Sequence, residues 1–300
     1  MRYYENISIW RALACVGVLF YHIMHKIFNG QLNNWFMFGR YGVLFFFIIT
    51  GFLAFSSNDI RAHVGKYWIK RAVRILPLYI TVQIIWFIVF AIEEKDLLKG
   101  FKLLISDFAG GTWTIWVTIV FYFLAPLLIK VIDSWWKAWV GFLLLCVPRY
   151  LFIMYGFACL DRTWQYLCFC MQGVLAYFII KQKKEAISVF LLAGILVVLK
   201  LMGSMDDYFI YSIIFMILFI TSRDLCFKHS TTKTVIQTVD KYSYNIFLLH
   251  PIVLRFIPNN SAVEVMIAGV LLTAIASVIS FYCVDYPWNG LLKRKMTNER

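Results

Sequence analysis

Residues 7–27 read ISIWRALACVGVLFYHIMHKI, an apolar run that only a few polar side chains interrupt. A helix of about 20 such residues spans the hydrocarbon core of a bilayer, which is about 30 Å thick. No small-residue cleavage site precedes the stretch with His22, His25 and Lys26, and the run contains Arg11. We therefore expect a permanent membrane helix here and not a signal peptide.

The composition of the whole chain points the same way. Of its 300 residues, 62% are hydrophobic and only 15% are charged, and the mean hydropathy is +0.75. A soluble domain carries about 25% charged residues, so lipid must replace water around much of this surface. Apolar runs recur without a soluble stretch long enough for a second core, so we expect a single membrane domain over residues 1–300.

Breaks that contain charged residues, Pro or Gly divide the chain into about ten candidate transmembrane helices. The predicted spans are residues 7–27, 41–57, 75–92, 113–131, 135–155, 164–180, 186–202, 208–222, 242–257 and 263–284. The expected fold class is therefore an all-α integral membrane protein with about ten spans.

The basic residues predict the orientation of these spans. With a cytoplasmic N-terminus, nineteen Lys and Arg fall on the cytoplasmic side and nine on the opposite side. Because Lys and Arg accumulate in cytoplasmic loops, we expect both termini in the cytoplasm. The same bias accounts for the net charge of +13 without a nucleic-acid partner. The seven scattered cysteines include no CxxC pair, so we expect neither a metal site nor a disulfide framework.

Arg11 and His22 are the most informative polar residues of the first span. Their separation of eleven residues is close to three helical turns, so both lie on one helical face, about 16 Å apart along the axis; His25 shares that face approximately. A neutral imidazole can accept a proton near neutral pH, and the pair can line a hydrated cavity as catalytic residues. Alternatively, Arg11 reaches lipid phosphates and His22 bonds a backbone carbonyl.

A second basic cluster precedes Pro77 and consists of Lys66, Lys70, Arg71 and Arg74. Arg71 and Arg74 are three residues apart and hence adjacent on a helical face. Two guanidinium groups side by side make a clamp for phosphate. The alternative is a topological cluster that binds anionic lipid head groups.

Two further positions carry weaker signals. His250 precedes Pro251, which bends a helix by removing a backbone hydrogen bond, so His250 is either a structural residue that satisfies the broken ladder or a catalytic one. Gly51 permits either close helix packing or backbone contact with a ligand. All sixteen carboxylates fall at span ends or in loops, which disfavours a proton-driven transporter with an embedded carboxylate relay.

The chain resembles the acyltransferase-3 family of bacterial integral membrane O-acyltransferases, which includes the acetylases of O-antigen and capsule. Five segments carry the resemblance, in family order. They are Arg11-Ala-Leu-Ala with His22 after ten intervening residues, Thr50-Gly51-Phe52-Leu53, Arg71-Ala-Val-Arg74-Ile-Leu-Pro77, Trp113 through Pro126, and Ser243-Tyr244 through His250-Pro251. A weaker sixth is Val284-Asp285-Tyr286-Pro287.

The resemblance implies a multi-pass protein of the bacterial cytoplasmic membrane that takes an acyl group from acyl-CoA, typically acetyl-CoA. The group passes to a hydroxyl of a surface glycan or a lipid-linked sugar. Arg11 and His22 would line the transfer path, with His22 as general base or transient acyl carrier, and Arg71 and Arg74 would hold the phosphates of coenzyme A. Two other classes stay open, namely a transporter or flippase of a glycan or lipid-linked intermediate and a non-enzymatic partner in envelope assembly.

Overall fold

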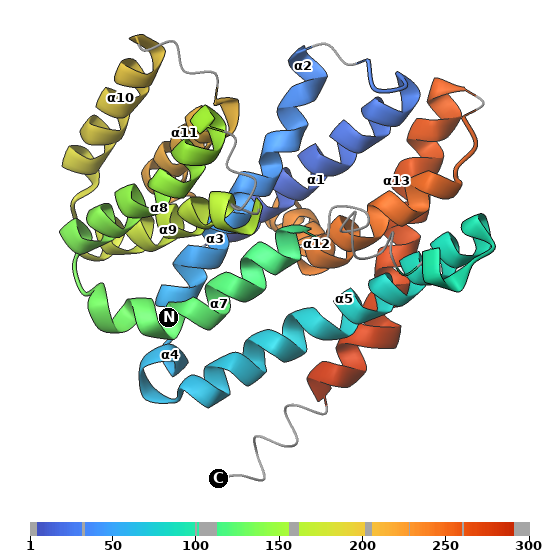
Figure 1. Ribbon diagram of the computed structural model, residues 1–300, viewed down its shortest axis with the longest axis horizontal. Coiled ribbons are helices and arrows are strands. Elements are labelled where there is room, and N and C mark those ends of the chain that lie inside the picture. The colour runs from blue at the N-terminus through green and yellow to red at the C-terminus, as the bar shows by residue number, and fades with distance from the viewer. Residues whose placement is uncertain are drawn as a thin grey trace. The chain divides into compact units, whose positions relative to one another are not determined.

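The computed structural model describes residues 5–31, 34–99, 101, 113–155, 162–201, 206–227, 229–259 and 261–290. Within these ranges the regular structure is entirely helical (Figure 1). The helices are α1 (Glu5–Ile27), α2 (Asn34–Met37), η1 (Phe38–Tyr41), α3 (Gly42–Phe55), α4 (Asp59–Ala62), α5 (Val64–Glu94), α7 (Trp113–Val131), α8 (Trp135–Tyr155), α9 (Arg162–Lys181), α10 (Glu185–Leu201), α11 (Asp207–Thr221), α12 (Ser230–Phe256), α13 (Ala262–Ser280) and the π-helical segment η3 (Phe281–Asp285).

Six of these helices are long and apolar enough to cross a membrane, counted over the described residues. They cover Glu5–Ile27, Phe38–Phe55, Val64–Glu94, Trp113–Val131, Thr163–Lys181 and Ala262–Gly290. The other four predicted spans also fall on helices, namely α8, α10, α11 and α12. The chain is therefore an all-helical, multi-pass membrane protein.

Two helices extend well beyond their predicted spans. The helix α5 begins at Val64 and α12 at Ser230, eleven and twelve residues before the apolar segments that predicted them. A hydropathy pattern predicts only the apolar part of a helix, because the backbone hydrogen bonds of the helix continue through polar residues. The basic cluster from Lys66 to Arg74 consequently lies within α5.

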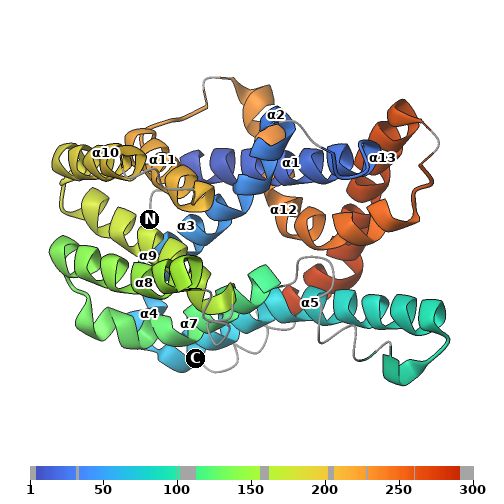
Figure 2. The same ribbon diagram turned by 45° about the horizontal axis from the view of Figure 1, so that its top comes forward.

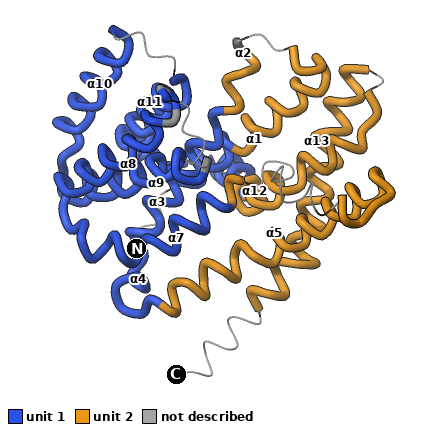
Figure 3. Tube along the Cα trace, viewed as in Figure 1, with its two compact units in different colours: residues 1–14, 41–64, 116–237 blue, residues 15–40, 65–115, 238–300 orange. Residues whose placement is uncertain are grey.

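The chain divides into two compact units, each made from segments that are distant in the sequence (Figure 3). Unit 1 contains residues 1–14, 41–64 and 116–237, and unit 2 contains residues 15–40, 65–115 and 238–300. Several helices, among them α3, α8, α9 and α11, therefore belong to unit 1, whereas α5, α13 and most of α12 belong to unit 2.

The core of unit 1 surrounds α9, in which most side chains are buried. The helix crosses α3 through two glycines, and a Cβ atom on Gly51 would collide with the Cys170 carbonyl of α9. A Cβ on Gly173 would likewise collide with the Ile48 carbonyl of α3. The two backbones thus touch, and of the two alternatives for Gly51 the structure supports close helix packing.

In unit 2, α1, α12 and α13 pack together around a small apolar cluster (Figure 2). Ile23 and Met24 of α1 contact Leu254 of α12, with Ile257 and Val265 completing the cluster. Gly269 of α13 lies against Ile23 and Leu254, with room for no larger residue without displacement of these side chains. This packing holds the His22 end of α1 against α12.

Candidate active site

The structure brings His22 of α1 next to His250 of α12, within unit 2. The centroids of the two imidazole rings are 4.8 Å apart and the ring planes are inclined by 44°. His22 is half-buried, and His250 is only 2% exposed. The nearest aromatic neighbours are Tyr21, whose ring meets His22 edge-on at 4.9 Å, and Phe247, 6.0 Å from His250.

The backbone of α12 determines which nitrogen of His250 carries a proton. Nδ1 lies 3.0 Å from the carbonyl oxygen of Ile246, one turn earlier in the helix. A carbonyl oxygen only accepts hydrogen bonds, so Nδ1 is the donor and the neutral ring keeps its lone pair on Nε2. That Nε2 atom is buried and has no hydrogen-bond partner among the described residues.

His250 thus has one ring nitrogen bonded to the backbone and one without a partner among the described residues. Its Nδ1 bonds the Ile246 carbonyl, whereas Pro251 removes the helical donor of a different carbonyl, that of Phe247. Its Nε2 keeps the lone pair of a base beside a second imidazole. A buried polar atom without a partner costs about 1–3 kcal/mol, and such a cost is typical of a functional group rather than of packing.

The two other polar residues of interest on α1 are His25 and Arg11. His25 is exposed near the turn at Gly30 and lies 5.9 Å from the ring of Tyr21. Arg11 is half-buried in the part of α1 that belongs to unit 1. The helix is continuous between Arg11 and His22, as the three-turn spacing requires.

Arg71 and Arg74 lie on α5 in unit 2. The guanidinium of Arg71 is half-buried and stands 5.3 Å from the centroid of the Tyr67 ring. Arg74 is exposed and interacts electrostatically with Asp285 of η3. The contact with the Tyr67 ring restricts the Arg71 side chain.

Three of the sequence segments noted above meet next to Arg74. The hydroxyl of Tyr244 donates to the carbonyl of Ile75 at 2.7 Å, which joins α12 to α5. Asn245 donates from Nδ2 to Asp285 at 2.7 Å and to Ser280 at 2.9 Å. Asp285 is 8% exposed, so a carboxylate that the sequence placed at a span end is a buried partner of the α5 segment.

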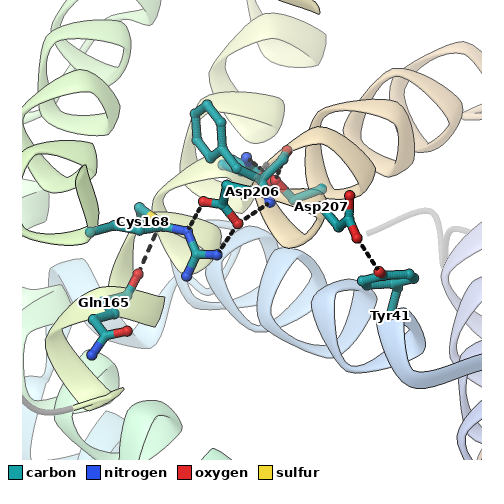
Figure 4. A network of polar contacts seen from close by, with 9 residues as sticks. Tyr41, Gln165, Cys168, Asp206 and Asp207 are labelled. Atoms are coloured by element: carbon teal, nitrogen blue, oxygen red, sulfur yellow. Dashed lines mark hydrogen bonds and ion pairs between the residues drawn. The ribbon is translucent and has the colours of Figure 1, made fainter. Parts of the chain in front are cut away.

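Unit 1 contains a buried ion pair that the sequence did not reveal. Arg149 of α8 donates from Nε to Asp206 Oδ2 at 2.6 Å and from Nη2 to the other carboxylate oxygen. Figure 4 shows Asp206 in this network, with Asp207 directed toward Tyr41. Arg149 lies within the predicted span 135–155, and Asp206 lies between two predicted spans. A single sequence carries no signal that pairs residues so far apart.

Among the described residues, no group of three His, Cys, Asp or Glu side chains could hold a metal ion. The functional roles of Arg11, His22, Arg71 and Arg74 remain predictions.

Comparison with known proteins decides the family. The sequence profile of the acyltransferase-3 family, described as an acyltransferase domain, matches residues 4–286. The chain belongs to this family. The matched family model is one of acyltransferases that transfer groups other than aminoacyl groups.

Two curated relatives were found. Nodulation protein 10 of Rhizobium leguminosarum bv. viciae is 27% identical over 172 residues, which cover 45% of this chain and 46% of the relative. YrhL of Bacillus subtilis, named as a peptidoglycan O-acetyltransferase, is 26% identical over 130 residues, 40% of this chain and 19% of the relative. The chain thus spans less than half of either relative. No solved structure matches significantly.

Proposed function

We propose that this protein is an O-acyltransferase of the bacterial cytoplasmic membrane. It moves an acyl group, in the first place acetyl, from acyl-CoA to a hydroxyl of a cell-surface polysaccharide or a lipid-linked sugar. The family and the O-acetyltransferase name of one relative support this activity. We further propose that residues 1–300 act as one acyltransferase domain, because the family profile runs through both units.

The observation that carries the proposal is the pairing of His22 with His250, whose Nε2 is buried without a partner. In the reaction, an imidazole nitrogen takes the proton of the acceptor hydroxyl while the hydroxyl oxygen bonds to the acyl carbon. The carbon–sulfur bond of the thioester breaks, and coenzyme A leaves as a thiolate that regains a proton. His22 is the general base or a transient acyl carrier, and His250 is the adjacent acceptor for a proton.

Arg71 and Arg74 supply the phosphate-binding part of the donor site in this proposal. Coenzyme A carries several phosphates, and planar guanidinium groups bind phosphate through two parallel hydrogen bonds. The cation–π contact of Arg71 with Tyr67 supports the assignment because it restricts the side chain before the donor arrives. Arg11 would line the transfer path on the helix that carries His22.

The topology of ten spans with cytoplasmic termini is part of the proposal. Two contacts between helix ends support it. In the proposed topology, the two helix ends that each contact joins lie on the same side of the membrane. Arg255 at the end of α12 pairs with Glu93 at the end of α5, at 2.5 Å and 3.0 Å. Arg223 at the end of α11 pairs with Glu185 at the start of α10. Reporter fusions after Glu94 and after Lys181 should give opposite locations.

Replacement of the two histidines tests the chemistry. We expect His22→Ala to lower acetyl transfer from labelled acetyl-CoA to membrane glycan by roughly 10²- to 10⁴-fold, the usual contribution of a positioned base. His250→Asn is the sharper variant, since its amide can still donate to the Ile246 carbonyl but offers no basic nitrogen. We expect a loss of the same order, with the protein inserted at wild-type levels.

The outcome also separates this function from its rivals. Wild-type transfer rates in both histidine variants would refute the chemical assignment. Movement of a glycan or lipid-linked sugar across the membrane without acyl-CoA, unaffected by Arg71→Ala, would replace the enzyme by a transporter or flippase. Ester groups on the surface glycans that disappear on deletion of the chain, and return with it, support the transferase.

A further inference from the structure

Four tyrosines of unit 1 gather around the ends of three helices, and the proposed chemistry does not use them. They are Tyr41 of η1, Tyr166 of α9, and Tyr208 and Tyr211 of α11, and we call them the tyrosine cluster. The Tyr41 ring lies 4.2 Å from that of Tyr211 and 5.1 Å from that of Tyr208, and Tyr166 meets Tyr208 at 5.9 Å.

The ion pair between Arg149 and Asp206 fixes the geometry of this cluster. The guanidinium carbon of Arg149 stands 5.2 Å from the Tyr166 ring and 6.0 Å from the Tyr208 ring. Asp206 also accepts from the backbone N–H of Phe209 at 3.2 Å and so caps α11. The ion pair and the cap together connect the first turn of α11 to α8.

Part of the cluster is accessible from outside the protein. Tyr41 is buried, but Tyr166, Tyr208 and Tyr211 are only half-buried, and Asp207 beside them is exposed. Tyr208 and Tyr211 are three residues apart and share a face of α11. The hydroxyl of Tyr41 donates to Asp207 Oδ2 at 3.2 Å (Figure 4). A carboxylate has about four lone-pair positions, so one that already accepts protein hydrogen bonds can accept more from a ligand.

This combination favours one class of ligand. A pyranose ring has apolar C–H faces that cover aromatic rings and a rim of hydroxyls that donate to carboxylates. A cationic ligand would be repelled by the guanidinium of Arg149, which already makes cation–π contacts with the Tyr166 and Tyr208 rings. An acyl chain has no donor for a hydrogen bond to the Asp207 carboxylate. A charged group that faces such chains is unfavourable, by about 2.5–3.5 kcal/mol in lipid.

We propose that Tyr166, Tyr208, Tyr211 and Asp207 form the subsite that binds the sugar of the acceptor. The inference rests on the proposed function, in which the acceptor is a sugar hydroxyl. In the topology proposed above, Tyr41, Tyr166 and Tyr208 begin spans at the side opposite the cytoplasm. The acceptor would therefore be held on the side where surface glycans are modified.

The test uses the full-length protein in proteoliposomes and measures acetyl transfer from labelled acetyl-CoA. The acceptor is a glycan and lipid extract from cells that lack the chain, added in increasing amounts. We expect Tyr208→Ala and Asp207→Asn to raise the extract concentration for half-maximal rate by roughly ten- to a hundredfold, with the KM for acetyl-CoA unchanged. The matched control is Tyr150→Ala, since Tyr150 of α8 is 55% exposed, and it should leave both constants unchanged.

Two results would overturn the subsite. The variants could behave like Tyr150→Ala, or they could raise the requirement for acetyl-CoA and for the extract in parallel, as a general loss of structure would. If the wild-type protein transfers no acetyl group, the proposed function fails. The subsite is then tested separately, by measuring the binding of glycan to the protein. Immobilised wild-type protein should then retain glycan from the extract and the Tyr208→Ala protein should not; equal retention refutes the subsite.

Discussion

Asp206→Asn tests how unit 1 is held together. The substitution keeps the size of the side chain and its cap on α11 but removes the charge that neutralises Arg149. The Arg149 side chain is 6% exposed and the Asp206 side chain 13% exposed, so water cannot replace the lost partner. Removal of one member of a buried pair costs about 3–5 kcal/mol, and we expect Asp206→Asn to lie in this range.

The double variant Arg149→Met with Asp206→Asn sharpens the prediction. It removes both charges and fills the space of the arginine stem, and such replacements are often neutral or stabilising. We expect it to recover most of the stability that Asp206→Asn loses, so the two substitutions should be strongly non-additive.

The assay is the fraction of detergent-solubilised protein that stays monodisperse after heating. A loss of 3–5 kcal/mol corresponds to a fall in the midpoint of about 5–15 °C for a chain of this size. The surface pair of Lys137 and Asp133, with side chains 34% and 65% exposed, is the control, since exposed pairs are worth about 0–1 kcal/mol. Additive losses, or an Asp206→Asn protein as stable as wild type, would refute the argument.

Three further results are expected. Gly173→Ala should destabilise unit 1 by about 1–3 kcal/mol, because its Cβ would collide with the Ile48 carbonyl, whereas Gly194→Ala in α10, where nothing lies within 4 Å, should not; equal melting midpoints would contradict this. Arg71→Ala should raise the KM for acetyl-CoA more than Arg71→Lys, which keeps the charge but loses the planar fork; no change in steady-state kinetics would remove Arg71 from the donor site. Deletion of the chain should abolish glycan O-acetyl esters, as measured by alkaline release of acetate, and His22→Ala should fail to restore them.

Hydropathy predicted where the helices lie, and the structure has a helix at each of the ten predicted segments. It could not predict the amphipathic starts of α5 and α12, since those residues are helical without being apolar. For Gly51 the sequence allowed either close helix packing or backbone contact with a ligand. The structure supports packing, because Gly51 and Gly173 lie where α3 crosses α9.

The candidate site was only partly predictable. His22 and His250 were each noted as chemically capable residues, but 228 positions separate them, and only the packing of α1 on α12 brings them together. The partner of Arg74 was missed because Asp285 looks like a solvated charge at a helix end, whereas a π-helical segment buries it. Pairings of this kind depend on tertiary contacts that no local pattern encodes.

The hydrogen bond from His250 to the Ile246 carbonyl has a consequence for substitutions at position 246. The acceptor belongs to the main chain, so any residue other than proline at position 246 preserves it, whatever its side chain. Side-chain replacements at position 246 should therefore leave the proton on Nδ1 of His250. The position of the proton on the imidazole follows from the backbone of the helix and not from the side chain one turn earlier.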